Sequence, residues 1–433
     1  MSGKRSKDKP KGGKLVDWAI TVVIILTAGA IAVVSFQNGM AMKDQAPNLQ
    51  VAGTAPTGTA CIILSKEELA PQQGVLFGVN LDMHAKSLYT YSYDLGHKPA
   101  VTSYTTNFPL TEEDRSNLLR TVEQVHEDGH MLLLGVQPDK GLASVTDEAV
   151  EALANDLAAF NDYGVPVFVN FGEDMNGPWT PWAQQPSAYI TAFRRVAAAV
   201  HLNAPGSAMM WSPSYGAGYP FTGSAFDAKP GTPDYAALDT DHDGQLTGAD
   251  DPYSPYYPGD EAVDWVGMSI AFWGTEPPWG ENEIPAAGKL TDQLTGRDLG
   301  PRGDDSPIPD FYKIYGEMHG KSVAITDTAA LYKPGNGAGA DELSIKQAWW
   351  SQLFSEQFPV LFPRVKMVSW LEIVRTEDSA GGKVDWSVTS TPLIKDAFTK
   401  SLPAWLQFGP PEQCTPAIEL EHPSFIPKSS AAH

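Results

Sequence analysis

The feature that most constrains the fold is the regular alternation of eight short β-branched segments with amphipathic segments along the chain. Strands that alternate with helices predict βαβ units and a parallel sheet. Eight such units predict a closed (β/α)8 barrel, also called a TIM barrel, in the α/β class. A doubly wound sheet is disfavoured, because its first strand usually leads into a glycine-rich phosphate loop and this sequence shows none. The segments predicted as strands are Val75–Leu81, Ala100–Asn107, His130–Pro138, Val165–Asp174, Ser207–Ser214, Val263–Gly274, Ser322–Ala329 and Val365–Ile373.

The clearest helix is predicted for Thr146–Phe160, which has Asp147 and Glu148 in its first turn and Gly164 after its end. Acidic residues stabilise the amino-terminal turn because they compensate the positive end of the helix dipole. Glycine after the last turn is a typical stop signal. Further helices are predicted for Glu112–Glu127, Pro186–Leu202 and Leu343–Phe358.

The charge is distributed unevenly along the chain. The 433 residues carry a net charge of −22, whereas residues 1–14 hold six basic residues and one acidic residue and so carry +5. The rest of the chain therefore carries −27. A body this acidic repels a phosphate backbone, which excludes nucleic-acid binding as a function class.

A run of nineteen uncharged residues, Trp18–Phe36, follows the basic tail. As a helix it would be about 28 Å long at ~1.5 Å per residue, close to the ~30 Å hydrocarbon core of a bilayer. We therefore expect a cytoplasmic tail at 1–14 and a transmembrane signal-anchor at 15–36. The expected product is a single-pass membrane protein with its barrel outside the cytoplasm. The alternative is a secreted protein whose signal peptide is cleaved near residues 39–41.

After the apolar run, residues 37–60 have the composition of a linker. The barrel is expected at 61–408 and a C-terminal tail at 409–433. The 2 cysteines exclude a zinc cluster or a disulfide-dense scaffold. Cys61 and Cys414 flank the barrel, and in an oxidising compartment a disulfide between them would join the two ends of the domain. The alternative is two unpaired buried thiols.

Carboxylates and aromatic residues gather where the predicted strands run into their following loops, which is where (β/α)8 barrels carry their chemistry. Aromatic faces stack on the apolar face of a pyranose, while carboxylates and amides bind its hydroxyls. This composition indicates a sugar site. The residues assigned to substrate binding are Glu173, Asn176, Trp179, Trp182, Tyr215, Trp273 and Trp370.

The segment NFGEDMNGPWTPW after the fourth strand resembles the signature of glycoside hydrolase family 26, the β-mannanase-like barrels. That signature reads approximately R-F-x-H-E-M-N-G-x-W-x-P-W. Other segments agree in order, among them GVNLDM, LLLGVQP, WSPSYGAGYPF, GKSVAITDTAA and MVSWLE. The resemblance covers about Gly74 to Pro403. It implies a retaining hydrolase with a Glu acid/base after strand four and a Glu nucleophile at the end of strand seven.

Matched motif to motif, the two catalytic positions are Asp174 and Asp327, and Glu173 stands where the family has His. Retaining hydrolysis needs carboxyl groups ~5–5.5 Å apart, and each Glu-to-Asp change withdraws a carboxylate by about 1.5 Å. The gap would then be about 8 Å, inside the ~6.5–9.5 Å range of inverting enzymes. A misplacement of ~1 Å also costs up to ~10²-fold in rate, so an inactive site is equally compatible. Adjacent residues of a strand face opposite ways, so one of Glu173 and Asp174 should aim at the mouth.

A second motif lies between strands five and six, where the segment 239–251 has the D-x-D-x-D-G pattern of EF-hand-like loops. Asp239, Asp241 and Asp243 would bind Ca²⁺ by their side chains, Gln245 by its carbonyl and Asp250 at the twelfth position. We expect a structural calcium site. The alternative is an acidic turn without metal.

Two functions follow from these features. The first is a membrane-anchored extracellular glycoside hydrolase acting on a β-linked, mannan-like polysaccharide. The second is a catalytically inactive polysaccharide-binding protein at the cell surface. Whether the Asp174–Asp327 pair hydrolyses its ligand distinguishes the two.

Overall fold

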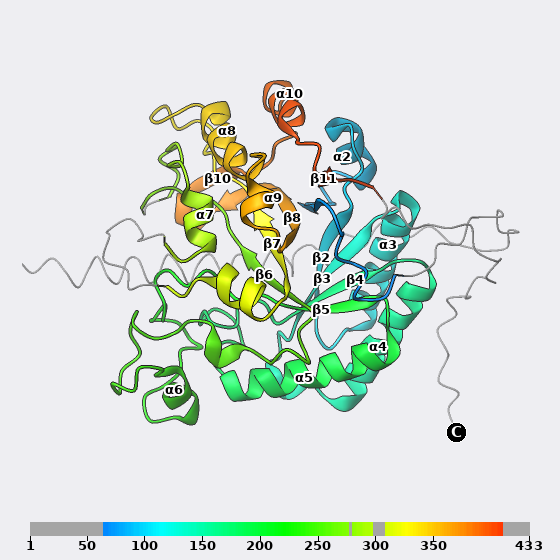
Figure 1. The fold of residues 1–433 in the computed structure, drawn as a ribbon, viewed down its shortest axis with the longest axis vertical. Coiled ribbons are helices and arrows are strands. Elements are labelled where there is room, and N and C mark those ends of the chain that lie inside the picture. The colour runs from blue at the N-terminus through cyan, green and yellow to red at the C-terminus, as the bar shows by residue number, and fades with distance from the viewer. Residues whose placement is uncertain (1–63, 277–278, 298–307, 410–433) are drawn as a thin grey trace, which may run out of the picture.

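The structure is a computed structural model that describes residues 64–276, 279–297 and 308–409, and these form a closed barrel surrounded by helices (Figure 1). Strands β1 to β8 are parallel and pair in chain order, and β1 also pairs with β8, which closes the sheet. The predicted (β/α)8 barrel is therefore confirmed. A short strand, β11 (Leu406–Gln407), extends the sheet beside β1.

The barrel strands are β1 (Val75–Leu81), β2 (Val101–Asn107), β3 (Met131–Gln137), β4 (Val167–Phe171), β5 (Ser207–Trp211), β6 (Trp265–Ser269), β7 (Ser322–Thr328) and β8 (Val365–Glu372). The α-helices are α2 (Leu88–Leu95), α3 (Glu112–Asp128), α4 (Asp147–Asp162), α5 (Pro186–Asn203), α6 (Pro233–Leu238), α7 (Lys289–Leu294), α8 (Glu342–Leu353), α9 (Phe358–Leu361) and α10 (Pro392–Ser401). A hairpin of β9 (Val374–Glu377) and β10 (Gly382–Asp385) follows β8. Shorter helical turns are η1 (Leu142–Ser144), η2 (Ser254–Tyr256), η3 (Tyr312–Met318) and η4 (Asp378–Ala380).

Several helices, among them α3 and α4, begin at side-chain caps that the sequence carries. Thr111 and Thr146 accept hydrogen bonds from the backbone amides of Asp114 and Ala149, so α3 and α4 start where unpaired amides need an acceptor. The Asp114 side chain also accepts from the Thr111 amide, which completes a capping box. These local signals explain why the predicted and observed helix starts agree so closely.

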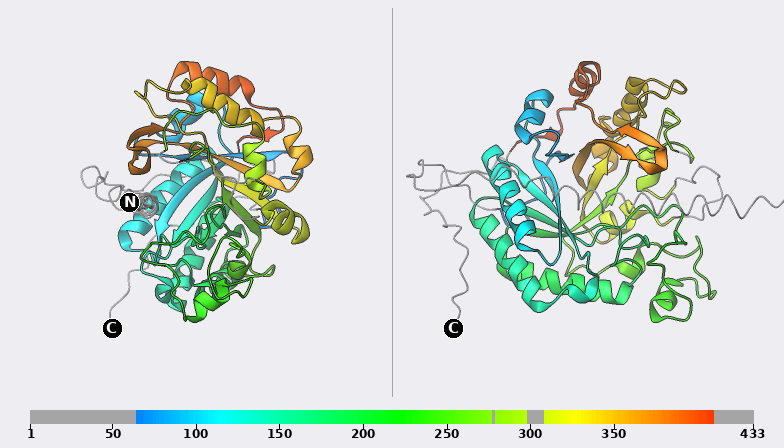
Figure 2. Two further views of the ribbon diagram at one scale, coloured as in Figure 1. Left: turned by 90° about the vertical axis from the view of Figure 1, so that its left-hand side faces the viewer. Right: turned by 180° about the vertical axis from the view of Figure 1, so that it is seen from behind.

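Alternate residues of each strand serve two separate cores. Outward side chains such as Phe77 on β1 pack under the ring of helices seen around the strands (Figure 2). Inward side chains such as Leu76, Phe168 and Trp265 form a second cluster inside the barrel. Trp265, the first residue of β6, is 2% exposed, as expected of a core residue. Side chains therefore fill the interior of the barrel, as is usual for this fold.

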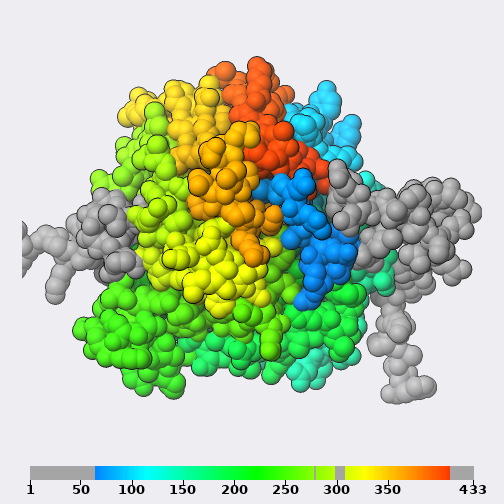
Figure 3. Space-filling view, viewed as in Figure 1, coloured from blue at the N-terminus to red at the C-terminus, as the bar shows by residue number. Residues whose placement is uncertain are grey.

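The segment that precedes β1 closes the amino-terminal end of the barrel. Leu64 and Leu69 belong to the same buried cluster as the inward strand residues. Lys66 forms an ion pair with Asp264, which lies directly before β6, and its backbone amide donates to the Pro205 carbonyl before β5. The segment is blue in the space-filling view (Figure 3). The opposite, carboxyl-terminal end of the barrel is therefore the end at which a ligand can enter.

The predicted localisation, a single-pass membrane protein, is corrected by the helices that the structure describes. Within 64–276, 279–297 and 308–409, no helix combines the length and the apolarity needed to cross a bilayer. The physical reason is amphipathicity: α5, with 18 residues, buries Phe193 and Val196 against the barrel and exposes Arg194 and Arg195. The tail at 1–14, the anchor at 15–36, the linker at 37–60 and most of 409–433 lie outside the described residues.

Candidate active site

Inward side chains change from apolar to polar as the strands approach the carboxyl-terminal end of the barrel. On β1 the inward series runs from Leu76 to Asn80, and on β4 it runs from Phe168 to Asn170. On β3 it ends in Gln137. These amides therefore form the floor of a polar mouth above the apolar interior.

Glu173 follows β4 and lies on this floor. Its Oε1 accepts a hydrogen bond from Gln137 Nε2 at 3.1 Å, and its Oε2 accepts one from Asn170 Nδ2 at 2.8 Å. Burial, together with the charges of Asp174 and Asp327, raises the pKa of Glu173 to about 8, against the opposing effect of the Gln137 hydrogen bond. The backbone is fixed as well, because Trp182 Nε1 donates to the Glu173 carbonyl at 2.8 Å.

Asp174 is held toward the next strand along the chain. Its backbone amide donates to the Ser212 carbonyl at 3.0 Å, and its carboxylate accepts a 2.6 Å hydrogen bond from Ser214 Oγ. Its φ of 59° is left-handed, which costs about 1 kcal/mol or more for a residue other than glycine. Burial raises the pKa of the Asp174 carboxyl, and the Ser214 hydroxyl partly offsets that effect.

Asp327 enters the mouth from β7, on the other side of the barrel. The register of β7 shifts against both neighbouring strands here, and Ser269 of β6 pairs with Asp327. Bulges of this kind re-aim a side chain and are frequent beside active sites. Asn80 Nδ2 donates to Asp327 Oδ1 at 3.0 Å. Burial raises the pKa of Asp327 to about 7, with Asn80 and Arg375 opposing the shift and the charge of Asp174 adding to it.

The three mouth carboxylates influence one another without converging on one point. Among the described residues, one group of three potential metal ligands from Asp, Glu, His or Cys has its ligand atoms within 4.8 Å of one another. This group is Asp239, Asp241 and Asp243. Glu173, Asp174 and Asp327 are therefore spaced too widely to share one metal ion as a set. Burial and neighbouring carboxylates nevertheless raise the pKa values of Glu173 and Asp327.

Three aromatic residues that follow the carboxyl-terminal ends of β4, β5 and β6 keep part of their surface exposed. Trp179 is partly exposed and packs on Phe221 with ring centroids 5.0 Å apart. Trp273 is partly exposed and meets the buried Trp386 edge-on at 4.7 Å. Tyr215 is also partly exposed. These three residues keep surfaces on which a sugar ring could stack.

Three residues that the sequence assigned to substrate binding lie elsewhere. Trp370 is 0% exposed, because it takes an outward position on β8 and packs on Phe398 of α10. Trp182 is 3% exposed and supports the Glu173 backbone. Asn176 is 0% exposed, and both atoms of its amide bond the Ser214 backbone at 2.8 Å. All three side chains are buried against their own chain, so they offer little surface to a ligand.

The residues that the sequence reasoning missed are the amides Asn80, Gln137 and Asn170 and the hydroxyl of Ser214. A signal was present for the amides: each is a polar residue on the inward phase of a strand, near its carboxyl end. No comparable signal marks Ser214, since its contact with Asp174 depends on the path of two loops.

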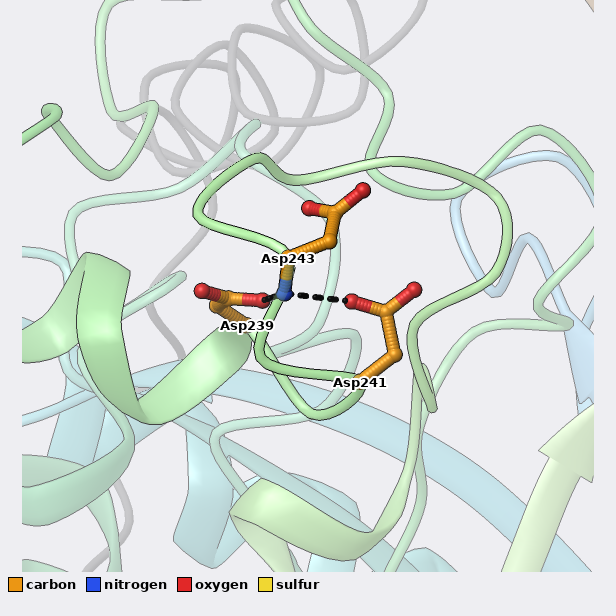
Figure 4. A group of neighbouring side chains, drawn as sticks. All are labelled: Asp239, Asp241 and Asp243. Carbon is orange, nitrogen blue, oxygen red and sulfur yellow. Dashed lines mark hydrogen bonds between the residues drawn. The ribbon is translucent and has the colours of Figure 1, made fainter.

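The predicted calcium loop brings three of its five residues together (Figure 4). The amide of Asp243 donates to Asp239 Oδ1 and Asp241 Oδ1, both at 3.1 Å. The amide of Gly244 donates to Asp239 Oδ2 at 2.9 Å, and its φ of 85° permits the tight turn. Carboxylate oxygens so arranged are the hard ligands that Ca²⁺ prefers.

Asp250 is used differently from the prediction. Asp250 is 3% exposed, and its two oxygens accept from the amides of Thr240 at 2.6 Å and Thr247 at 2.8 Å. It therefore fixes the backbone of the loop. The Gln245 side chain is exposed, and the backbone amide of Gln245 donates to Asp243 Oδ1 at 2.7 Å. The predicted disulfide between Cys61 and Cys414 lies outside the described residues.

The geometry therefore defines a class of protein. It is a closed (β/α)8 barrel with carboxylates and aromatic residues near the carboxyl-terminal ends of its strands. No family model matches the sequence, and no curated protein matches it. Among solved structures, the chain is similar to the catalytic domain of a Bacillus sp. JAMB-750 GH26 endo-β-1,4-mannanase, with 16% identity over 81% of this chain and 93% of that chain and a TM-score of 0.48. A Cellulomonas fimi endo-β-1,4-mannanase double mutant gives 14% identity, 82% and 77% coverage and a TM-score of 0.48. The structure of Thermotoga maritima Cel5A in complex with mannotriose is similar with 10% identity over 76% of this chain and 97% of that chain and a TM-score of 0.42. The barrel assignment depends on the strand order and not on these similarities.

Proposed function

We propose that this protein is a glycoside hydrolase that cleaves a β-linked, mannan-like polysaccharide at the carboxyl-terminal mouth of its barrel. One observation carries the proposal. Glu173 and Asp174 follow β4, and Asp327 lies on β7, on the other side of the barrel. Glycosidases need one carboxyl group that keeps its proton and another that acts as nucleophile or base. Carboxyl groups with raised pKa values in a shared, partly buried space have this property.

The proposed reaction uses the two sides of the mouth separately. A carboxylic acid on the β4 side protonates the glycosidic oxygen. Asp327, held by Asn80, either attacks the anomeric carbon or removes a proton from the water that attacks it. In the sequence-based assignment the acid is Asp174, and the Glu173 carboxyl then binds a substrate hydroxyl.

The substrate class is supported by the rim and by the sequence motif. Trp179, Tyr215 and Trp273 offer partly exposed aromatic faces. A cavity of about 330 Å³ at the same end of the barrel, lined by Asp82, Lys86 and Glu372 among others, gives room for a further sugar unit. The resemblance of the β4 segment to β-mannanase-like barrels supports a β-mannan over other polymers.

The test is release of reducing sugar from a panel of β-mannans and β-glucans by the purified chain. The native protein is expected to act on at least one member, and Asp327→Asn is expected to abolish this activity. The matched control is Glu151→Gln, because Glu151 is an exposed carboxylate on α4. No release by the native protein from any member of the panel contradicts the proposal.

The second candidate function is polysaccharide binding without hydrolysis. It is favoured by the shorter aspartate side chains at the two positions that carry glutamate in the family signature. Affinity electrophoresis in gels that contain each polymer distinguishes the candidates. Retardation without sugar release supports a binding protein, whereas release that Asp327→Asn abolishes supports the hydrolase.

We also propose that the loop at 239–251 binds a structural calcium ion. Asp239, Asp241 and Asp243 offer three carboxylate oxygens within 4.8 Å of one another, which fits a Ca²⁺ ion with ligands at ~2.3–2.6 Å. The bound ion would neutralise three adjacent negative charges and hold the loop between β5 and β6. Terbium luminescence titration and thermal unfolding with and without Ca²⁺ test this assignment independently of hydrolysis.

A further inference from the structure

We propose that Glu173, and not Asp174, is the residue that donates a proton to the glycosidic oxygen opposite Asp327. The inference rests on the proposed function and names the acid of that same site. It assigns a catalytic role to a residue that occupies the histidine position of the family signature.

The first step of the argument is where the carboxyl group is held. Gln137 and Asn170 are inward residues of β3 and β4, and each donates an amide hydrogen to a different oxygen of Glu173. Asp327 is held by Asn80, the inward residue of β1. Both carboxyl groups are therefore fixed from inward strand positions, which aim them at the axis of the barrel.

The second step is that Asp174 is directed elsewhere. Its amide bonds Ser212 and its carboxylate bonds the Ser214 hydroxyl, so both ends of the residue are tied to the chain after β5. Its side chain is also one carbon shorter than that of Glu173. Asp174 therefore acts as a positioning residue whose charge disfavours ionisation of its two neighbours.

The third step is the balance of charge in the mouth. Three carboxyl groups act on one another there, and the cation that opposes the shift of Asp327 is Arg375. Arg375 Nε already lies 2.6 Å from Glu377 Oε1, and Glu377 is 1% exposed. Its positive charge is therefore largely compensated. Among the described residues, these carboxyl groups are therefore opposed by little uncompensated positive charge, which favours retention of a proton at neutral pH.

Glu173 is the group on which that proton is favoured. The charges of both Asp174 and Asp327 act on it, and burial adds to them, so that its pKa is raised to about 8. Each carboxyl oxygen has two acceptor positions, so the amides can hold Glu173 while a proton occupies a free position. Asn170 Oδ1 has no hydrogen-bond partner among the described residues, so this amide can also turn and accept from the acid.

In the proposed step the O–H bond of Glu173 breaks and its proton passes to the glycosidic oxygen. The bond between that oxygen and the anomeric carbon cleaves, and its electron pair stays with the leaving sugar. Asp327, or a water molecule that gives its proton to Asp327, forms the new bond to carbon. Glu173 is left as a carboxylate, which the two amides stabilise. Where Asp327 itself formed the new bond, a water molecule then displaces Asp327 from the anomeric carbon and gives its proton to Glu173, which frees the sugar and restores both groups. Where water attacked directly, Asp327 returns its proton to solvent and Glu173 regains one from solvent.

The kinetic test compares Glu173→Gln and Asp174→Asn on two substrates. On the natural polymer, loss of the acid should lower kcat by about 10²–10⁴-fold. On an aryl glycoside whose dinitrophenolate leaving group needs no proton, Glu173→Gln should lower kcat/KM, which reports the bond-cleavage step alone, less than 10-fold, on the order of one lost positioning contact. Asp174→Asn should affect both substrates equally. A leaving-group-dependent loss in Asp174→Asn, with none in Glu173→Gln, overturns the assignment and leaves the proposed function intact.

A second measurement locates the proton without turnover. Infrared spectra at pH 7, where Asp327 is also partly protonated, should show a carbonyl band of protonated carboxyl groups that Glu173→Gln weakens and Glu151→Gln leaves unchanged. An unchanged band intensity in Glu173→Gln overturns the inference. Absence of hydrolysis by the native protein overturns the proposed function instead, and the infrared result then still decides which group holds the proton.

Discussion

Asn170 Nδ2 lies 2.8 Å from Glu173 Oε2, so the last inward side chain of β4 holds the carboxyl group that follows the same strand. Asn170 is 2% exposed, and its amide cannot be replaced there by water without opening the floor of the mouth. Through this contact, an inward residue of a regular strand fixes the direction of a side chain in the loop that follows. It therefore gives the site a rigid support from the barrel itself.

Replacement of this support should impair the site more than the fold. We expect Asn170→Ala to lower kcat by about 10²-fold, because a misplacement of ~1 Å can have that cost. Loss of a donor to the ionised carboxylate should also raise the pKa of Glu173, which moves the alkaline limb of the pH–rate profile upward. Kinetics across pH would measure both effects. Asn203→Ala on the exposed end of α5 is the control, and an unmoved alkaline limb in Asn170→Ala would contradict the support role.

The pH dependence of activity should be a narrow bell. Hydrolysis needs Asp327 ionised and Glu173 protonated, so kcat/KM should rise through about pH 7 and fall through about pH 8. Because the two groups interact, these limbs describe the pair. Initial rates from pH 5 to 10 on a soluble β-mannan test this expectation. A broad optimum below pH 6 would show that the proton is held differently.

The fold was predictable because local signals agreed with the global pattern. The eight β-branched runs and the capped helices fall within a few residues of the observed elements, as for Val75–Leu81 and for α4 at Asp147–Asp162. The β9–β10 hairpin and the helical turn at Tyr312–Met318 were not predicted. Both are connections whose conformation depends on packing against the barrel and not on a periodic sequence.

The site was predictable to the level of the loop and not of the atom. Alternation predicted that only one of Glu173 and Asp174 faces the mouth, but both residues follow the end of β4, and the sequence cannot show that the left-handed backbone of Asp174 brings it to Ser214. The same alternation, counted through β8, would have put Trp370 on the outward face. A tryptophan near a strand end is a sugar-stacking residue only when its phase is inward or its loop is exposed.

Lys346 on α8 makes a different prediction, about stability. It is 0% exposed, and its Nζ donates to Glu342 at 2.6 Å and to Asp385 at 3.1 Å, which ties α8 to the end of β10. Removing one partner of a buried ion pair leaves uncompensated charge and costs about 3–5 kcal/mol. Chemical denaturation of Lys346→Met should show that loss. Lys400→Met on α10 should cost less than about 0.5 kcal/mol.

A compensated variant tests the cause of that loss. Combining Lys346→Met with Glu342→Gln and Asp385→Asn removes the charges that would otherwise stay buried. We expect this triple variant to recover part of the lost free energy of unfolding, since neutral groups are cheaper to bury. A triple variant less stable than Lys346→Met would show that packing, and not charge, explains the effect.

Calcium should stabilise the fold through the loop between β5 and β6. At about ten times its Kd, a bound ion adds ~1.4 kcal/mol, or about 2 °C in Tm for a domain of this size. Asp241→Asn should abolish the increase, because it removes one ligand charge. Asp250→Asn should instead lower Tm equally with and without Ca²⁺, since Asp250 bonds the backbone amides of Thr240 and Thr247. Equal Tm values for the native chain in Ca²⁺ and in chelator would contradict the site.

The raised pKa of Glu173 also predicts that the site costs stability. An acid whose pKa is higher in the folded state binds its proton more tightly there, so stability is lost as pH rises from about 4.5 toward about 8. Glu173→Gln removes this dependence. Because the side chain is partly exposed, we expect the variant to exceed the native protein by about 1–2 kcal/mol at pH 8.5 and by little at pH 5. Urea denaturation at both values measures the difference, with Glu151→Gln as control. If the difference in free energy of unfolding between Glu173→Gln and the native protein is the same at both pH values, Glu173 is not the group that keeps the proton.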